Sequence, residues 1–410
     1  MNFSSPGSNT VPPRNNDLEP RLVRVLLLSP VRGLDVQNGD VSYTEGLIAG
    51  ASEFIEYTTY DEALADGRIV EVNAYRHATS SASRLRALIH SAENRLRRRE
   101  WLFREPYRYF SITPNEFDLI HVHVFSVGLR ETSLPLVMST MLPQHFLYRD
   151  AERWAPWRVA LGVFAEKILA RIHDIQQNTY RLNRVACLVS VSEFCAHEYV
   201  RSGTVTHEQT RIVSCPVEEP STSSRPIPGH IGFIAQEFDV KGGQLVLDAY
   251  RALRRSRSDI RLTIVGCESR ISTCEARELN ITWLPRVPRD EVLTNLLPSM
   301  DVFAYPTMFD GLPLIVCEAL SLGVPVITSD YGALPEAIGQ GVGGIVCRNQ
   351  SSEAWAEAIA QALDPNRREQ LSTGARKLFA ERYNARTVAV QLEAVYRSCL
   401  ADACSRFHET

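Results

Sequence analysis

The hydrophobic positions of this chain form short apolar runs, separated by longer segments with helical spacing. In the first half, the apolar runs span residues 23–29, 117–125, 135–139, 186–192 and 211–215. Short apolar runs bounded by turn residues are typical of strands buried on both faces of a parallel sheet. Helix-compatible segments, the longest at 157–184, lie between them. The alternation predicts a doubly wound α/β domain.

The second half repeats this alternation after the stretch PVEEPSTSSRPIPG, whose Pro and Ser content predicts a linker. Strands are predicted at 230–235, 261–266, 281–284 and 301–305, and a hairpin-like or edge element at 341–347. We therefore expect a disordered tail at 1–20 and a Rossmann-like domain at 21–215. A linker at 216–229 should lead to a second Rossmann-like domain at 230–384, followed by a C-terminal helix at 385–410.

Composition narrows the class of protein. A chain of 410 residues exceeds one typical core and fits two domains of roughly 150 to 200 residues. The net charge of -4 creates no field that would attract nucleic acid or a membrane to the whole molecule. Nine cysteines without a C-x-x-C pair favour a reducing cytoplasm over a disulfide scaffold or a zinc site. No apolar run is long enough to span a bilayer.

Residues 84–101 predict an amphipathic helix in the first domain. Its apolar positions have helical spacing, and its arginines fall mostly elsewhere on the helix. The simpler interpretation is a surface helix with a solvated basic face. The alternative is peripheral contact with anionic lipid, which a basic amphipathic helix can bind.

Two polar features follow predicted strands of the first domain. His121 and His123 lie on the same face of one strand by its two-residue period. The strand pattern therefore does not indicate which of the two histidines would belong to a site. Gly33 and Gly39 flank a loop after the first strand, where they permit tight turns, and Asp40 could cap the helix that follows. Either feature is also compatible with a purely structural role.

The most informative stretch is 305–336, which reads YPTMFDGLPLIVCEALSLGVPVITSDYGALPE. A turn at Asp310-Gly311, with Pro313 close behind, precedes a helix predicted over 314–322. The free N–H groups at the start of a helix form an anion site. Glu318 is about one turn into this helix and can reach a polar ligand docked there.

This stretch resembles the donor-sugar motif of retaining glycosyltransferases with the GT-B fold, of the family 4-like group 1 type. That motif has an acidic residue, seven further residues and a Glu-Ala pair, then a small-residue turn and a Gly-x-x-Pro-Glu. The matching residues are Asp310, Glu318, Ala319, Gly323 to Ile327 and Gly332 to Glu336. The resemblance extends from Val23 to about Leu400 and is stronger in the second domain.

The resemblance implies two Rossmann-like doubly wound domains facing a cleft, with the C-terminal helix crossing back onto the first domain. It implies catalytic roles for His123, Lys241 and Asp310. The implied donor-binding residues are Gly39, Gln236, Lys241, Asp310, Gly311, Leu312, Leu314, Ile315 and Glu318. In this scheme the Glu318 carboxylate accepts from the ribose hydroxyls, Lys241 and helix amides hold the diphosphate, and Asp310 accepts from the sugar.

The implied activity is transfer of a hexosyl or N-acetylhexosaminyl group from a UDP- or GDP-linked sugar, with retention of configuration. The acceptor would be a glycan, a lipid-linked molecule or a small molecule, bound by the first domain. No D-x-D triplet occurs in the chain, so we expect neither a metal ion nor another cofactor. Nucleic acid is not an expected partner. A cytoplasmic enzyme, peripheral to the inner face of the membrane if 84–101 binds lipid, fits this scheme.

Three residues depart from the family pattern. Asp310 replaces the usual Glu, Pro313 stands where many relatives have Gly, and Gln236 replaces an Arg that would contact the diphosphate. Either Arg286 or Arg289 supplies the missing cation, or catalysis is weak. Two rival functions stay open, a nucleotide-sugar epimerase and a non-catalytic nucleotide-sugar-binding subunit.

Overall fold

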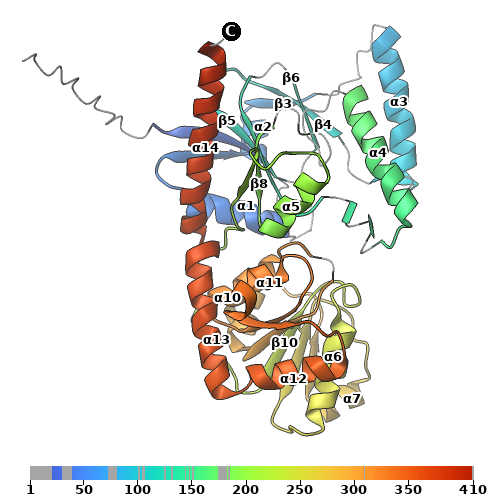
Figure 1. Ribbon diagram of the computed structural model, residues 1–410, viewed down its shortest axis with the longest axis vertical. Coiled ribbons are helices and arrows are strands. Elements are labelled where there is room, and N and C mark those ends of the chain that lie inside the picture. The colour runs from blue at the N-terminus through green and yellow to red at the C-terminus, as the bar shows by residue number, and fades with distance from the viewer. Residues whose placement is uncertain are drawn as a thin grey trace, which may run out of the picture.

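Two α/β domains lie end to end, and two consecutive helices at the C-terminal end of the chain run along them, one on each domain (Figure 1). The structure is a computed structural model. It describes residues 21–29, 39–72, 81–99, 102–103, 107–123, 126–130, 133–143, 145–146, 148–149, 152–173, 182, 185–308 and 310–408. The predicted tail at 1–20 and the loop that contains Gly33 lie outside these residues.

The first domain is built on a six-stranded sheet of order β2-β1-β5-β7-β8-β9. Its strands are β1 (Val23–Leu28), β2 (Ile55–Thr59), β5 (Leu119–His123), β7 (Leu136–Thr140), β8 (Val185–Ser190) and β9 (Thr210–Ile212). All neighbouring strands are parallel. Helices on this domain include α1 (Gly39–Gly50), α2 (Tyr60–Ala65) and α5 (Glu193–Arg201). The sheet therefore confirms the predicted doubly wound architecture of this half.

A second, three-stranded sheet in the first domain was not predicted. Its strands are β3 (Ile69–Glu71), β4 (Tyr107–Ile112) and β6 (Ser126–Arg130), in the order β3-β4-β6. β4 pairs with β6 in parallel and with β3 antiparallel. These strands lack long apolar runs because only some of their residues enter a core, so their hydrophobic pattern is weak.

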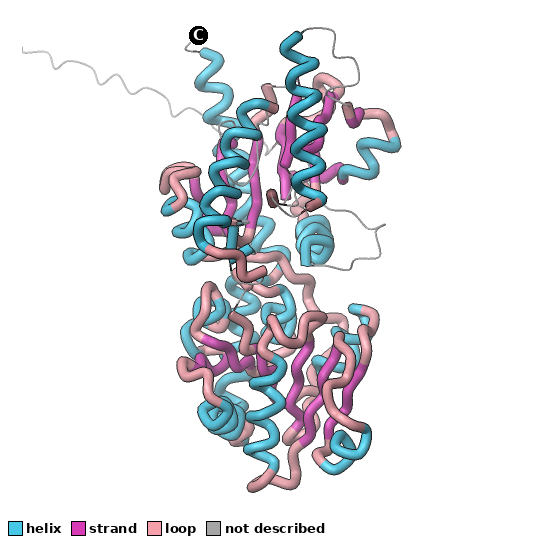
Figure 2. The backbone as a smooth tube through the Cα atoms, turned by 90° about the vertical axis from the view of Figure 1, so that its right-hand side faces the viewer, coloured by secondary structure: helices cyan, strands magenta, loops and turns pink. Residues whose placement is uncertain are grey.

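Two helices, α3 (Ser81–Arg98) and α4 (Pro156–Ile172), lie side by side at the outer edge of the first domain (Figures 1 and 2). The helix predicted over 157–184 is too long. α4 ends at Ile172, where the backbone N–H of His173 donates to the Leu169 carbonyl. The prediction runs past this end because apolar spacing does not itself mark where a helix stops. Residues 174–181 and 183–184 of the predicted range lie outside the described ones.

The second domain has another six-stranded sheet, of order β12-β11-β10-β13-β14-β15. Its strands are β10 (His230–Ile234), β11 (Arg261–Val265), β12 (Ile281–Leu284), β13 (Val302–Tyr305), β14 (Val326–Ser329) and β15 (Gly344–Cys347). All pairs are parallel, so β15 is an edge strand and the hairpin alternative is wrong. Its helices are α6 (Gly243–Arg254), α7 (Thr273–Glu278), α8 (Arg289–Glu291), α9 (Leu297–Ser299), α10 (Leu314–Ser321), α11 (Leu334–Ala337), α12 (Ser352–Ala362) and α13 (Pro365–Leu378).

The last helix, α14 (Ala385–His408), follows a π-helical turn at Phe379–Tyr383 and returns to the first domain. There it packs against α1 and β8. Ser52 donates a hydrogen bond of 2.6 Å to Glu393, and the Tyr396 hydroxyl lies 3.1 Å from that of Tyr57. In the described part of the chain, no helix is both long and apolar enough to cross a membrane.

His121 ties this helix to the first sheet. Its Nδ1 lies 2.5 Å from the Tyr396 hydroxyl and its Nε2 lies 2.9 Å from Ser139 Oγ. Complete burial, with His123 beside it, lowers the pKa of His121 to about 3. Burial is the larger cause because a charged imidazole loses its hydration there.

We expect His121 to make the fold acid-sensitive. An unfolded histidine titrates near 6.5, so between about pH 6.5 and 3 only the unfolded chain takes up this proton. Stability is therefore present above this window and falls as the pH drops through it, by up to about 1.4 kcal/mol per pH unit. The urea midpoint of His121→Gln should fall less steeply with pH than that of the wild type. His207→Gln, at an exposed position, should keep the wild-type slope, and equal slopes for all three proteins would contradict the prediction.

Candidate functional site

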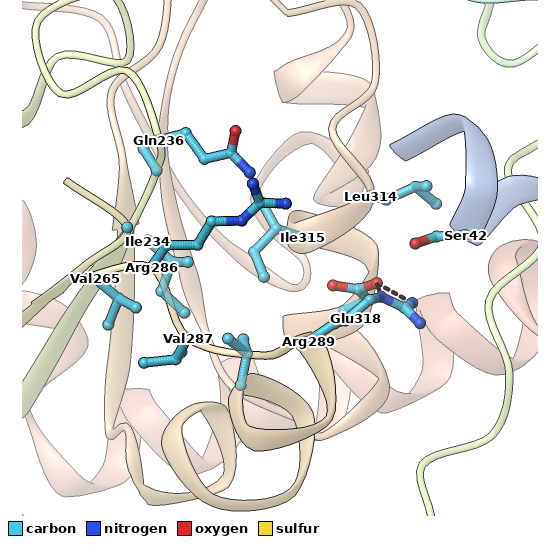
Figure 3. Close-up of a pocket in the computed structure, with 13 residues that line it drawn as sticks. Ser42, Ile234, Gln236, Val265, Arg286, Val287, Arg289, Leu314, Ile315 and Glu318 are labelled. Carbon is cyan, nitrogen blue, oxygen red and sulfur yellow. Dashed lines mark hydrogen bonds and ion pairs between the residues drawn. The ribbon is translucent and has the colours of Figure 1, made fainter. Parts of the chain in front are cut away.

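An open pocket lies between the two domains, at the carboxyl ends of strands in the second sheet. Ile234 and Val265 end β10 and β11 and line it, and Ser42 of α1 faces them from the first domain (Figure 3). Of the predicted donor-binding residues, Gln236, Leu314, Ile315 and Glu318 also line this pocket. Ligands of open α/β sheets bind at this edge, because the loops after the strands meet there.

Helix α10 presents both amides and a carboxylate to the pocket. Pro313 precedes it and no side chain caps it, so the first N–H groups have no partner within the helix. Glu318 lies on the same helix and is only 5% exposed. Its Oε1 accepts from Arg289 Nε at 3.1 Å and also from Nη2. Arg289 is also 3.8 Å from Glu45 of α1, so this guanidinium bridges the domains.

The pair between Arg289 and Glu318 also borders a second cavity. That cavity is lined by linker residues 217–221 together with Glu45 and Ser321. The ion pair therefore lies between the interdomain pocket and the predicted linker. A ligand that engages the Glu318 carboxylate must share it with Arg289 or displace that contact.

Asp310 is held by two side chains. Lys241 Nζ forms an ion pair with its Oδ1, and the Tyr305 hydroxyl donates to its Oδ2 at 2.8 Å. The Lys241 and Asp310 side chains are 14% and 16% exposed, so a ligand can still reach them. Burial and the negative charge of Asp310 raise the pKa of Tyr305 well above its usual value. Tyr305 therefore stays a hydrogen-bond donor and fixes the orientation of the carboxylate.

Gly242 presents Lys241 to this carboxylate. Its φ is +76°, a backbone conformation that residues other than glycine rarely adopt. A Cβ there would lie 2.8 Å from the carbonyl oxygen of Pro306. The turn that aims Lys241 at Asp310 thus needs glycine for both backbone angle and space.

The predicted motif also contacts the first domain. A Cβ on Gly311 would lie 3.1 Å from Leu142 and 3.2 Å from Cys195, so this turn packs directly against that domain. Leu312 is buried in the core beside it. At the other end of the motif, the Glu336 carboxylate accepts from the backbone N–H of Glu193 at 3.0 Å, at the start of α5. Burial raises the pKa of Glu336, which stabilises its neutral form relative to the charged one.

His123 lies in the interior of the first domain. It is fully buried, and its ring stacks on Tyr43 of α1 with centroids 4.1 Å apart. Its Nδ1 lies 2.8 Å from Ser139 Oγ, the same hydroxyl that bonds His121. Both histidines thus lie on one face, which confirms that inference from strand periodicity. His123 is not among the described residues that line the pocket, whereas Gly39 begins α1, the helix that carries Ser42.

Three site residues were not identified from the sequence. Tyr305 belongs to the motif but received no role, although its position at the end of β13 and before the Asp310 turn was a signal. Ser42 and Glu45 had no signal of their own, because α1 is brought to the second domain only by the tertiary fold.

Comparison with known families identifies the second domain. Residues 223–378 match the sequence profile described as "Glycosyl transferases group 1". Over 196 residues the chain is 30% identical to a D-inositol 3-phosphate glycosyltransferase of Corynebacterium aurimucosum, covering 44% of this chain and 45% of that protein. It is 26% identical to an MMP alpha-(1->4)-mannosyltransferase of Mycolicibacterium hassiacum, covering 70% of this chain and 72% of that protein. The first of these matches thus spans less than half the relative's length.

Solved structures extend the likeness to the whole fold. Sucrose-phosphate synthase from Thermosynechococcus elongatus aligns with a TM-score of 0.59 at 17% identity, covering 93% of this chain and 100% of that one. Anabaena Alr3699/HepE, solved in complex with UDP and glucose, aligns with a TM-score of 0.56 at 13% identity, covering 92% and 100%. Residues 223–378 therefore carry the sequence profile of the group 1 glycosyl transferases, and the chain as a whole has the two-domain GT-B fold of these solved structures.

Proposed function

We propose that this protein is a retaining glycosyltransferase that uses a nucleotide-diphosphate sugar. The observation that carries the proposal is the pairing of acidic and basic side chains around α10. Lys241 meets Asp310 just before this helix, and Arg289 meets Glu318 within it. A nucleotide sugar needs both kinds of group, since its ribose and sugar hydroxyls donate and its diphosphate accepts.

In this proposal each group has one part of the donor to hold. Glu318 accepts from the ribose hydroxyls and releases Arg289 toward the diphosphate. The amides of Leu314 and Ile315 and the ammonium of Lys241 hold the phosphate oxygens, because helix N-termini and cations both stabilise anions. Asp310, kept in place by Tyr305, accepts from the sugar hydroxyls.

The bond from the anomeric carbon to the phosphate oxygen breaks as the bond to the acceptor oxygen forms on the same face. The acceptor proton passes to the departing phosphate oxygen, so charge and atoms balance. Negative charge grows on the leaving diphosphate, and its stabilisation is the largest catalytic contribution. Lys241, Arg286 and Arg289 supply positive charge at this point, which we propose makes the reaction metal-independent.

Arg286 is the best candidate to replace the arginine that Gln236 lacks. Both Arg286 and Gln236 line the same pocket (Figure 3). We expect Arg286→Gln to raise the donor KM about tenfold, the effect of losing one charged hydrogen bond. Steady-state kinetics measure this, with Arg255→Gln, an exposed residue at the end of α6, as the control. An unchanged KM would assign the missing contact to another residue.

The donor is proposed to be UDP- or GDP-linked. Anabaena Alr3699/HepE was solved with UDP and glucose, and relatives are named as glycosyl- and mannosyltransferases. The acceptor is proposed to be a glycan, a lipid-linked molecule or a small molecule, bound by the first domain. Its identity is not carried over from D-inositol 3-phosphate glycosyltransferases, which match less than half of this chain.

A panel of UDP- and GDP-sugars tests the function. Thermal shift should first identify the nucleotide, because a specific ligand raises the melting temperature by mass action. The purified protein should then release the nucleoside diphosphate from that sugar slowly in water and faster with an acceptor, and NMR should show a retained anomeric configuration. Formation of a new sugar isomer from the donor alone would show an epimerase, and binding without turnover would show a non-catalytic subunit.

A further inference from the structure

Helix α4 carries an apolar stripe that faces away from the protein. The stripe consists of Trp157, Leu161, Phe164 and Ile168, which are 68%, 56%, 61% and 41% exposed. Their spacing of four, three and four residues places them on one side of the helix. The buried side carries Val159, Gly162 and Ala170 instead. A helix of a water-soluble domain normally turns its larger apolar side chains inward, so this arrangement is reversed.

Helix α3, beside α4, repeats the feature. Leu85, Leu88 and Leu96 are 59%, 68% and 43% exposed. Among the described residues, the two helices together hold seven of the sixteen exposed large hydrophobic side chains, on 35 residues of chain. The two helices form one outer edge of the first domain (Figures 1 and 2). Such clustering marks an interaction surface, whereas single exposed apolar residues need no explanation.

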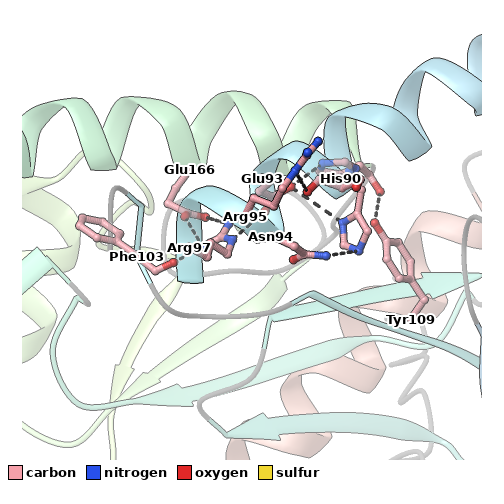
Figure 4. A network of polar contacts seen from close by, with 10 residues as sticks. His90, Glu93, Asn94, Arg95, Arg97, Phe103, Tyr109 and Glu166 are labelled. Atoms are coloured by element: carbon pink, nitrogen blue, oxygen red, sulfur yellow. Dashed lines mark hydrogen bonds and ion pairs between the residues drawn. The ribbon is translucent and has the colours of Figure 1, made fainter. Parts of the chain in front are cut away.

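The acidic side chains of the two helices point inward. Glu93 of α3 and Glu166 of α4 are each 3% exposed and both bind the buried guanidinium of Arg97. Arg97 Nη1 lies 2.7 Å from Glu166 Oε1, and Arg97 Nη2 lies 2.6 Å from Glu93 Oε1. His173 Nε2 lies 2.8 Å from the other Glu93 oxygen. Figure 4 shows this network between the helices, which fixes which face each helix turns outward.

The exposed charges are therefore all of one sign. Glu93 and Glu166 are the only acidic residues in α3 and α4, and both are buried. The exposed charged residues of the described side chains are Arg86, Arg95, Arg98, Lys167 and Arg171. This basic surface stands out because the whole chain has a net charge of -4.

We propose that α3 and α4 together form a docking surface for an anionic lipid bilayer. Trp157 and Phe164 enter the interface between headgroups and acyl chains, where aromatic side chains are favoured, and the basic residues contact lipid phosphates. Charge decides against a second copy of this chain on the same surface, because two basic faces would repel each other. The inference does not rest on the proposed glycosyl transfer, since none of these residues lines the donor pocket.

Co-sedimentation of the full chain with vesicles tests this surface. The wild type should bind vesicles of phosphatidylcholine and phosphatidylglycerol and bind pure phosphatidylcholine much more weakly. The variant Trp157→Ser/Phe164→Ser should lower the partition coefficient by about tenfold or more, because both side chains lose apolar burial. Val390→Ser on α14, at a residue 67% exposed, is the matched control and should bind like the wild type.

The charged half of the surface is tested separately. Lys167→Gln/Arg171→Gln should bind anionic vesicles more weakly and show a shallower dependence on salt, because screening acts on fewer charges. Lys377→Gln on α13, where the side chain is 69% exposed, should not change either result. Equal binding of the wild type to neutral and anionic vesicles, or none to both, would overturn the proposal.

A second copy of the chain would give a different outcome. Analytical ultracentrifugation would then show a wild-type dimer that Trp157→Ser/Phe164→Ser dissociates, which would also overturn the lipid proposal. The two surface variants, Trp157→Ser/Phe164→Ser and Lys167→Gln/Arg171→Gln, should retain wild-type affinity for the donor nucleotide. Vesicle binding without donor turnover would therefore count against the proposed enzyme alone, and turnover without vesicle binding against the docking surface alone.

Discussion

Lys241→Ala is expected to weaken nucleoside diphosphate binding by about 1 to 3 kcal/mol, the range for a lost charged hydrogen bond. Turnover should fall further than binding, because the lysine acts most strongly on the charge that develops on the leaving diphosphate. Isothermal titration calorimetry measures the first effect and donor hydrolysis the second. Lys377→Ala, at an exposed lysine of α13, should alter neither.

Lys241→Ala also removes the ion partner of Asp310, so a loss of affinity could come from the carboxylate left behind. The double variant Lys241→Ala/Asp310→Asn separates these causes, because its neutral amide no longer needs a cation. If the double variant recovers wild-type affinity, Lys241 serves Asp310 and not the diphosphate. Persistent loss supports direct contact between the lysine and the phosphate oxygens.

Glu318→Ala is the second substitution expected to have a large effect on nucleotide binding. We expect it to weaken binding of the nucleoside diphosphate by about 1 to 3 kcal/mol, because a carboxylate that accepts from the ribose is removed. The wild type should prefer the ribonucleotide to its 2′,3′-dideoxy analogue, and the variant should bind both equally. This loss of discrimination identifies the ribose as the partner, which a lower affinity alone would not do.

Glu318→Ala also leaves Arg289 without its nearest anion, although Glu45 lies 3.8 Å from that guanidinium. Glu291→Ala, at an exposed glutamate on the same side of the domain, is the control for general charge effects. A variant that still prefers the ribonucleotide would remove Glu318 from ribose binding. The ion pair with Arg289 would then be its structural role.

Local patterns predicted much of this molecule correctly. Continuous apolar runs identified most strands of both large sheets, because strands buried on both faces need apolar residues at every position. The exceptions are β2 and β14, for which no strand was predicted. The two-residue period placed His121 and His123 on one face, where both meet Ser139. The predicted helix after Pro313 is α10, with Glu318 about one turn into it.

Long-range contacts could not be predicted in this way. The partners of His121 and Glu318 are Tyr396 and Arg289, and each pair is joined only by the path of the chain through the fold. The small sheet of β3, β4 and β6 was missed because its strands are short and weakly patterned. Ser42 reaches the pocket, and Glu45 reaches Arg289, only because α1 is carried to the interdomain cleft.

By itself, the sequence determined two α/β domains, the helix that opens the candidate donor site and the amphipathic character of residues 84–101. Spacing along the chain is enough for these, because they depend on contacts between near neighbours. Only the tertiary structure decided which side of α3 and α4 faces water. Arg97 pairs with Glu93 and Glu166 between the helices, so the face of each helix that carries this charged network is buried and the apolar stripe lies on the exposed face.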